Sequence, residues 1–362
     1  MPNSTDHERT LPQEMQITAQ TGDLALLQTQ LAQWESQVSA PNQTTTTTTT
    51  TTNQSQEQKQ DNLSFKPTLT EQVERAYMAD RTGKAGPLYD LLSRLLVQAA
   101  RTNQAAVARY ILGERGGFVT SMAMRRGMAA SAFDVLEVFR EYGWQVNEPV
   151  QDGRCPILGF VTNNEARVRW CLEQGADPNA RNKNKYMDVP SQAGRYASVP
   201  VLQLLAARGA NFRCSNALQR AAEAETETES ADRMELLQWL LDEAGFPINQ
   251  REFEYDPEEF HKWWGNGLGT ALHFAVYAND PERVRFLLER GCDVNLKDTL
   301  GRTVRELCRE EKNAEVIAIR DSWGSDPSLH GQSSGIRDRG AYTSVRPFHE
   351  VLLYRPVPGV RQ

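Results

Sequence analysis

The feature that most constrains this chain is a helix-turn-helix signature that returns after one repeat length. Residues 270–288 read as two short helices, each with apolar residues at spacings of three and four, and Gly291 follows them. Thr303 stands 33 residues after Thr270 and begins the signature again. A period of this length is typical of proteins built from stacked repeats, in which each unit contacts only its neighbours. The chain is therefore predicted to be an all-α stack of helix pairs.

Local signals begin and end the second helix of this unit. Asp280 followed by Pro281 is a favourable start, because the Asp side chain accepts from unpaired backbone amides and Pro has no amide to leave unpaired. Gly291 supplies the left-handed turn that ends the helix. Helices of roughly eight to ten residues are unstable alone in water, so they must bury their apolar stripes against neighbouring pairs. The presence of one such helix pair therefore predicts further helix pairs beside it.

The same signals recur along the chain with decreasing fidelity. The glycines that are predicted to end second helices are Gly143, Gly175, Gly209, Gly245 and Gly291. An Asn follows four residues later at Asn147, Asn179, Asn249 and Asn295. The apolar residues before them are Leu136 and Phe139, then Val168, Cys171 and Leu172, then Leu202, Leu205 and Ala206, then Leu237, Leu240 and Leu241, and finally Val284, Leu287 and Leu288.

This pattern resembles the ankyrin repeat. The Thr-Pro-Leu-His opening of that family stands here as Thr-Ala-Leu-His at residues 270–273, and in weaker form at residues 155–158 and 303–306. The resemblance covers roughly residues 90–322, and the polar homopolymer run nearer the N-terminus resembles insertions in ankyrin proteins of filamentous fungi. It implies an ankyrin-repeat solenoid whose concave face and turn tips bind other proteins, with His273 joining adjacent repeats through its ring nitrogens.

Composition divides the chain into five predicted segments. An unbroken Thr run from Thr44 to Thr52 lies in a stretch with too little apolar surface to offset the entropy of ordering. The predicted repeat domain contains repeats that end near residues 118, 147, 182, 213, 250 and 297, and a degenerate last repeat at 298–322. The segments are a disordered N-terminus at 1–11, a degenerate repeat at 12–36, a low-complexity insertion at 37–68, the repeat domain at 69–322 and a poorly ordered tail at 323–362.

Charge and residue content disfavour several classes of function. A net charge of −7 disfavours a binder of duplex nucleic acid, which would need a basic surface. The five cysteines are an odd number without a close pair, so neither a disulfide framework nor a zinc site is indicated. The chain has no apolar run of about 18 residues and a polar N-terminus, from which we expect an intracellular, cytoplasmic or nuclear protein without a membrane partner. No catalytic or cofactor motif is recognisable, so no cofactor, metal or enzymatic activity is expected.

The segment at residues 251–266 is the most distinctive candidate surface. It lies between Gly245 and Gly291, where the spacing is 46 residues, so about 13 residues are added to a repeat of about 33. The added segment interleaves aromatic residues with acids, which favours either an exposed contact surface for a basic partner or a lid over the neighbouring helices. Its aromatic and acidic residues are Phe253, Tyr255, Phe260, Trp263, Trp264, Glu252, Glu254, Asp256, Glu258 and Glu259.

The ankyrin resemblance places the expected protein contacts at turn tips and in this added segment. The leading hypothesis is a monomeric, non-enzymatic scaffold or adaptor that binds a protein partner. A nuclear regulatory module that holds a transcription or chromatin protein is the alternative, and an enzyme with an unrecognised site is a remote third. The expected contact residues are Asn182, Lys183, Asn184, Tyr186, Phe212, Arg213, Glu254, Tyr255, Trp263, Trp264, Lys297, Asp298 and Leu300.

Overall fold

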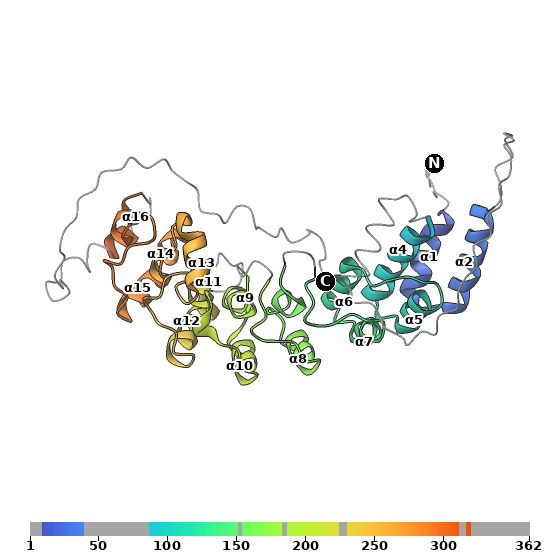
Figure 1. Cartoon of the computed structure of the whole chain (residues 1–362), viewed down its shortest axis with the longest axis horizontal. Coiled ribbons are helices and arrows are strands. Elements are labelled where there is room, and N and C mark those ends of the chain that lie inside the picture. The colour runs from blue at the N-terminus through green and yellow to red at the C-terminus, as the bar shows by residue number, and fades with distance from the viewer. Residues whose placement is uncertain are drawn as a thin grey trace, which may run out of the picture. The chain divides into compact units, whose positions relative to one another are not determined.

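The computed structural model describes residues 9–39, 87–150, 154–182, 187–223, 230–310 and 316–319 (Figure 1). The Thr run and the predicted C-terminal tail lie outside these residues. The chain divides into two compact units. The first contains residues 1–161 and 166–177, and the second contains residues 162–165 and 178–362. Each unit consists of helices and turns, and the described residues contain isolated β-bridges in place of a sheet.

In the first unit, helices pair along the chain and the pairs stack on one another. Helix α1 packs on α4 and α4 on α6, which makes one row, while α5 packs on α7 in a second row. The α-helices are α1 (Leu11–Thr21), α2 (Leu24–Ser39), α4 (Pro87–Arg101), α5 (Ala105–Gly113), α6 (Ser121–Ala129), α7 (Phe133–Glu141) and α8 (Glu165–Glu173), with a 3-10 turn η1 (Ile157–Phe160).

The second unit has the same two-row arrangement. Helix α11 lies between α9 and α14, α14 also contacts α16, and α10 packs on α12 behind them. The α-helices are α9 (Val189–Tyr196), α10 (Val199–Ala207), α11 (Ala217–Glu223), α12 (Ser230–Asp242), α13 (Pro257–Trp263), α14 (Ala271–Tyr277), α15 (Pro281–Glu289) and α16 (Val304–Glu310), with 3-10 turns η2 (Phe212–Cys214) and η3 (Trp264–Asn266). Residues 316–319 are also helical.

Close packing of α9 against α11 requires a small residue in α9. A Cβ atom added at Gly194 would lie 2.3 Å from the backbone oxygen of Ala217 in α11. Buried side chains of both rows fill the space between helices, and they include the apolar stripe of α15, formed by Val284, Leu287 and Leu288. Gly194 therefore allows α9 and α11 to approach closely.

The predicted helix ends are confirmed by the backbone. All five glycines that were expected to end second helices have positive φ, between 61° and 104°. The Asp280 side chain caps α15 by accepting from the Arg283 amide at 3.0 Å. Cys171 and Cys292 are buried, and burial raises the pKa of each thiol to about 12.

Asn147, Asn179 and Asn249, each four residues after a glycine, join their repeats to the next one. Asn179 donates from Nδ2 to the Gly209 carbonyl at 2.8 Å and accepts at Oδ1 from the Asn211 amide at 2.7 Å. Asn147 and Asn249 make corresponding contacts with the following repeat within their own units. The sequence signal of glycine and asparagine therefore marks an inter-repeat hydrogen bond.

Two of the predicted apolar stripes are displaced in the structure. In α10 the exposed Ala206 is outside the stripe, and Val201 is buried beside Leu202 and Leu205. In α12, Leu236 is buried in the same way and Leu241 is only half-buried. Residues at i, i+1 and i+4 lie on nearly the same helix face as those at i, i+3 and i+4, so the spacing alone left this rotation undetermined.

Arginines in the second helices of repeats donate hydrogen bonds to carbonyl groups near the C-terminal ends of helices in neighbouring repeats. The sequence did not suggest this feature. Arg283 donates from Nη1 to the Ala222 carbonyl near the end of α11 at 3.1 Å, and Arg233 does the same near the end of α9 at 3.4 Å. In the first unit, Arg167 donates to the Ala129 carbonyl at 2.6 Å. A cation is favourable at a helix C-terminus, where carbonyl groups lack helical partners.

Candidate protein-binding surface

Residues 251–266 form a compact insertion that consists of a turn, α13 and η3. The turn is closed by the Asp256 amide, which donates to the Phe253 carbonyl at 2.8 Å. Asp256 then caps α13, because its Oδ1 accepts from the Glu259 amide and Pro257 occupies the first helical position. The insertion begins at an isolated bridge between Arg251 and Thr270, so both of its ends return to the stack.

The tip of an earlier repeat holds the middle of the insertion. Arg181 forms an ion pair from Nη1 to Asp256 Oδ2 at 3.0 Å and donates from Nη2 to the Tyr255 hydroxyl at 2.9 Å. Its guanidinium also lies over the Tyr255 ring, 5.4 Å from the centroid. Burial raises the pKa of Tyr255, so its hydroxyl stays protonated and accepts this bond as a neutral group.

Helix α11 holds the first residues of the insertion from below. Arg220 forms an ion pair with the buried Glu252, and its guanidinium also contacts Glu223 at 2.9 Å. Burial raises the pKa of Glu252, while the charge of Arg220 opposes that rise. Asn216 Oδ1 accepts from the Phe253 amide at 2.8 Å, and the Phe253 ring is buried.

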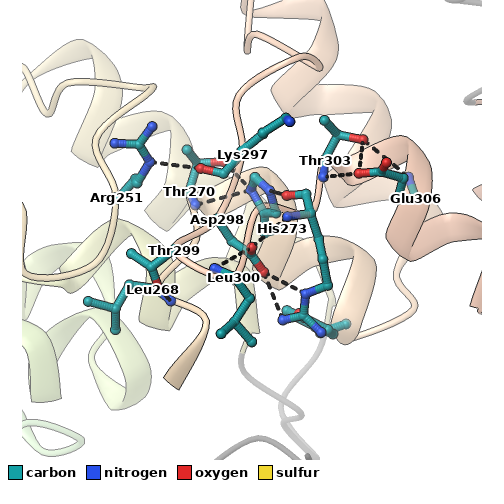
Figure 2. A network of polar contacts seen from close by, with 12 residues as sticks. Arg251, Leu268, Thr270, His273, Lys297, Asp298, Thr299, Leu300, Thr303 and Glu306 are labelled. Atoms are coloured by element: carbon teal, nitrogen blue, oxygen red, sulfur yellow. Dashed lines mark hydrogen bonds and ion pairs between the residues drawn. The ribbon is translucent and has the colours of Figure 1, made fainter. Parts of the chain in front are cut away.

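The turn tip after the next repeat contacts both ends of the insertion, and Figure 2 shows its contact with Arg251 at the first end. Arg251 donates from Nε to the Lys297 carbonyl at 2.9 Å. Thr299 donates from its hydroxyl to the Trp264 carbonyl at 2.5 Å, and the same hydroxyl accepts from the Leu268 amide at 2.8 Å. The insertion is thus fixed to three successive parts of the second unit.

Most of the acids in the insertion are paired within the unit. At least four of its five carboxylates form ion pairs with neighbouring cations, so the segment is not an open acidic surface. Such intramolecular pairs neutralise the field that would attract a basic partner. The pairs are Glu252 with Arg220, Glu254 with Arg251 at 3.0 Å, Asp256 with Arg181 at 3.0 Å and Glu259 with Lys262 at 3.3 Å.

The aromatic residues of the insertion have different environments. Phe253 is buried, and Trp263 is half-buried against its own helix, where Nε1 donates to Glu259 Oε2 at 2.7 Å. Trp264 is 49% exposed and meets the ring of Phe260 edge-on at 5.3 Å between centroids. The segment therefore acts as a lid through Phe253 and still presents Trp264 to solvent.

The structure separates the predicted contact residues into buried and accessible groups. Asn182, Phe212 and Asp298 are buried: Phe212 packs edge-on against Trp239, and Asp298 accepts from Arg302 at 2.8 Å. Lys183, Asn184 and Tyr186 lie outside the described residues. The residues with exposed or half-exposed side chains are Arg213, Glu254, Tyr255, Trp263, Trp264, Lys297 and Leu300. Whether any of them contacts a partner stays a prediction.

Trp264, Lys297 and Leu300 come from two adjoining loops, and we refer to them as the Trp264 surface. Thr299 connects the loops through its hydrogen bond to the Trp264 carbonyl. A Cβ added at Gly267 would lie 3.2 Å from Leu300 Cδ1, which places the end of the insertion against this leucine. The hydrogen bond from Thr299 to the Trp264 carbonyl could not be predicted from the sequence, because it depends on how the two loops pack.

His273 has the structural role that the resemblance implied. Its Nδ1 accepts from the Thr270 amide at 3.2 Å, and its Nε2 lies 3.3 Å from the Arg302 carbonyl in the next repeat (Figure 2). An amide can only donate, so Nδ1 carries no proton and Nε2–H donates to the carbonyl. Burial lowers the pKa of His273, which favours this neutral form.

The described parts of the chain provide neither a metal cluster nor a membrane span. Among these residues, no three His, Cys, Asp or Glu side chains are arranged to hold a metal ion. No helix within the same ranges combines the length and the apolar character needed to cross a bilayer.

Comparison with known proteins identifies the repeat. Residues 263–308 match the family model described as ankyrin repeats in many copies. The chain is 32% identical over 97 residues to potassium channel AKT1 of Arabidopsis thaliana, and 30% identical over 100 residues to protein fem-1 homolog A-like of Mus musculus. It is 26% identical over 117 residues to alpha-latrotoxin-Lg1a of Latrodectus geometricus.

These matches cover a limited part of each protein. They span 24%, 25% and 32% of this chain, and only 11%, 15% and 8% of the channel, the fem-1 homolog and the latrotoxin. The structure contains the all-α stacked helix pairs, glycine turns and Thr-x-x-His contact that are expected of such repeats. The chain therefore contains ankyrin repeats, with the family's pattern matched at residues 263–308.

Proposed function

We propose that this protein is a non-enzymatic scaffold or adaptor that binds a protein partner through the Trp264 surface. Ankyrin repeats are protein-interaction modules, which supports the general class. The observation that carries the specific surface is that Trp264 stays 49% exposed on a segment fixed by ion pairs and hydrogen bonds. A large apolar side chain that is already held in place loses little entropy on binding, which is typical of interface anchors.

The partner is proposed to offer an apolar side chain to Trp264. The carboxylates that suggested a basic partner are paired with Arg181, Arg220, Arg251 and Lys262, so a basic partner has little open negative charge to meet. The affinity of such an apolar contact with Trp264 should depend only weakly on salt concentration. We keep a monomeric state and a cytoplasmic or nuclear location as parts of the proposal, and imaging a tagged full chain tests the location.

Substitution of a single exposed aromatic residue tests the Trp264 surface. The full chain, its Trp264→Ala variant and its Tyr196→Ala variant are used as baits in quantitative affinity capture. Tyr196 is the matched control, since it is 45% exposed in the same unit but lies at the end of α9. We expect Trp264→Ala to lose proteins that the wild type and Tyr196→Ala retain, because an anchor residue contributes about 2 kcal/mol or more to binding. Equal loss with both variants, or no loss with either, would contradict the proposal.

A second variant separates the lid from the contact surface. Trp263 is half-buried and hydrogen-bonded to the buried Glu259, so Trp263→Ala should lower the melting temperature. Trp264→Ala should change it by less, because much of the Trp264 ring already contacts water. If Trp264→Ala were the more destabilising variant, its effect on capture would reflect unfolding and not contact.

A further inference from the structure

The first part of the insertion lies on the stack as a bound peptide would lie on a receptor. Residues 251–256 form a tight turn without regular helix, and its contacts reach two elements far away in the chain. Glu252 pairs with Arg220, the Phe253 amide donates to Asn216, and Asp256 pairs with Arg181, which is 75 residues distant. Two of these contacts are made by carboxylates of the insertion and one by its backbone amide.

The groups beneath the insertion form a defined receptor. Arg220 and Asn216 lie on or beside α11, and Arg181 belongs to an earlier turn tip. The Arg220 side chain is only 14% exposed, and its carboxylate partner Glu252 is 8% exposed. Two arginines and an amide oxygen are therefore directed at one short segment, which supplies two carboxylates and an amide hydrogen to match them.

We propose that Arg181, Asn216 and Arg220 form a recognition site for an acidic-aromatic peptide segment of the pattern Glu-Phe-x-Tyr-Asp, and that the insertion occupies this site in cis. A partner with such a segment binds here when the insertion is displaced. This site is separate from the Trp264 surface, because no residue of that surface contributes to it.

The way the insertion is held is compatible with exchange. Phe253 has φ of 61°, a left-handed conformation that is costly for a residue with an aromatic side chain. A buried ion pair such as Arg220 with Glu252 specifies one arrangement more than it stabilises it, because both charges lose their hydration. Gly265 lies near the end of the insertion and Gly267 and Gly269 follow it, and Gly267 has φ of 75°, so the returning segment contains residues with wide backbone freedom.

A synthetic peptide that spans residues 250–257 is the probe for this site. The receptor is the full chain with Glu252→Gln and Asp256→Asn, which weakens the insertion's own contacts and leaves both arginines in place. A segment tethered in cis has an effective concentration on the order of millimolar, so the wild-type chain should bind the probe weakly. We expect the weakened chain to bind the probe at least about tenfold more tightly than the wild type does, by titration calorimetry.

Three controls define the outcome. The Asp242→Asn chain loses an exposed ion pair with Arg290 elsewhere in the second unit and should bind the probe as weakly as the wild type. Adding Arg181→Gln to the weakened chain should abolish the gain, and Arg181 is exposed enough for this variant to fold. A peptide with its own Glu252→Gln and Asp256→Asn changes should not bind the weakened chain.

Hydrogen exchange of residues 251–256 accompanies each titration. Increased exchange in the weakened chain without a gain in probe binding would overturn the proposal, because the site would then be free and still not recognise the segment. Unchanged exchange in the weakened chain would also overturn it, since the insertion would then be a permanent part of the stack. The probe contains neither Trp263 nor Trp264, so either result leaves the Trp264 surface to be judged by its own capture experiment.

Discussion

The hydrogen-bond network of His273 allows the sharpest test of how the repeats are held together. The side chain is fully buried and connects Thr270, at the start of its own helix, with the Arg302 carbonyl of the next repeat. Replacing His273 with Ala would leave the Thr270 amide and the Arg302 carbonyl without this partner and would open a cavity. We therefore expect the loss of stability to exceed that of an ordinary core substitution of similar size.

The magnitude follows from these separate losses. A buried donor or acceptor left without its partner costs about 1–3 kcal/mol, and the lost ring contacts add a cavity cost of about 1–2 kcal/mol. Because two groups lose this partner, the free energy of unfolding should fall by about 3–8 kcal/mol for His273→Ala. For a unit of this size, each 1 kcal/mol lowers the melting temperature by about 2–4 °C, so a fall of roughly 6–32 °C is expected.

The preceding repeat indicates which substitution should rescue this loss. Gln219 stands in α11 where His273 stands in α14, and its Nε2 donates to the Gln250 carbonyl at 2.8 Å. His273→Gln can make the same bond to the Arg302 carbonyl. We expect it to recover more than half of the stability that His273→Ala loses.

The low pKa of His273 adds a pH dependence with a definite sign. Burial lowers its pKa in the folded protein, so the unfolded chain, with a pKa of about 6.5, binds a proton first as the pH falls. Stability therefore decreases below about pH 6.5, with a slope of up to about 1.4 kcal/mol per pH unit, until the folded pKa is reached. Other buried acids, such as Asp188 with its raised pKa, contribute a slope of opposite sign, so only the difference from His273→Gln isolates this effect.

Urea unfolding of the wild type, His273→Ala and His273→Gln at pH 7.5 and pH 5.5 measures these quantities. Hydrogen exchange of residues 270–302 locates the change, because repeat proteins can unfold in parts. The reasoning would be refuted if His273→Ala were within about 0.5 kcal/mol of the wild type, or if His273→Gln were equally destabilised. A wild-type stability that rises relative to His273→Gln on acidification would refute the neutral form assigned to the buried His273.

Two further substitutions test the packing of the stack by thermal unfolding. Asn179→Ala should cost about 1–2 kcal/mol, because it removes two hydrogen bonds to the next repeat, whereas Asn295→Ala, at the same repeat position but with no side-chain hydrogen bond among the described residues, should cost little. Gly194→Ala should cost more than about 3 kcal/mol, since its Cβ would overlap the α11 backbone, whereas Gly291→Ala meets nothing within 4 Å and should show only the strain of its positive φ, about 1 kcal/mol. Reversal within either pair would contradict the packing described.

Much of the fold follows from local signals in the sequence. Gly291 and Asp280 determine helix ends through backbone conformations that few other residues adopt as well, so their positions are readable one by one. The Asn at the fourth position after each glycine was recognisable as a pattern, but its partner in the next repeat was not. The sequence also did not determine which face of α10 and of α12 is buried, since an apolar spacing is compatible with neighbouring faces of a helix.

The candidate surface was less predictable than the fold. The length of the insertion identified it, and its Trp264 is exposed as a contact residue must be. Asn182, Phe212 and Asp298 also lie at turns, yet their side chains point inward. Position in a turn is a property of the local chain, whereas exposure depends on which neighbours cover the side chain.

The sequence by itself therefore determined the repeat, its period, its helix ends and the presence of an insertion at residues 251–266, because these depend on residues close together in the chain. Only the tertiary structure decided that Arg181 and Arg220 neutralise acids of the insertion, that Phe253 is buried and that Trp264 remains outside. Those outcomes depend on residues up to 75 positions apart, whose proximity no local pattern encodes.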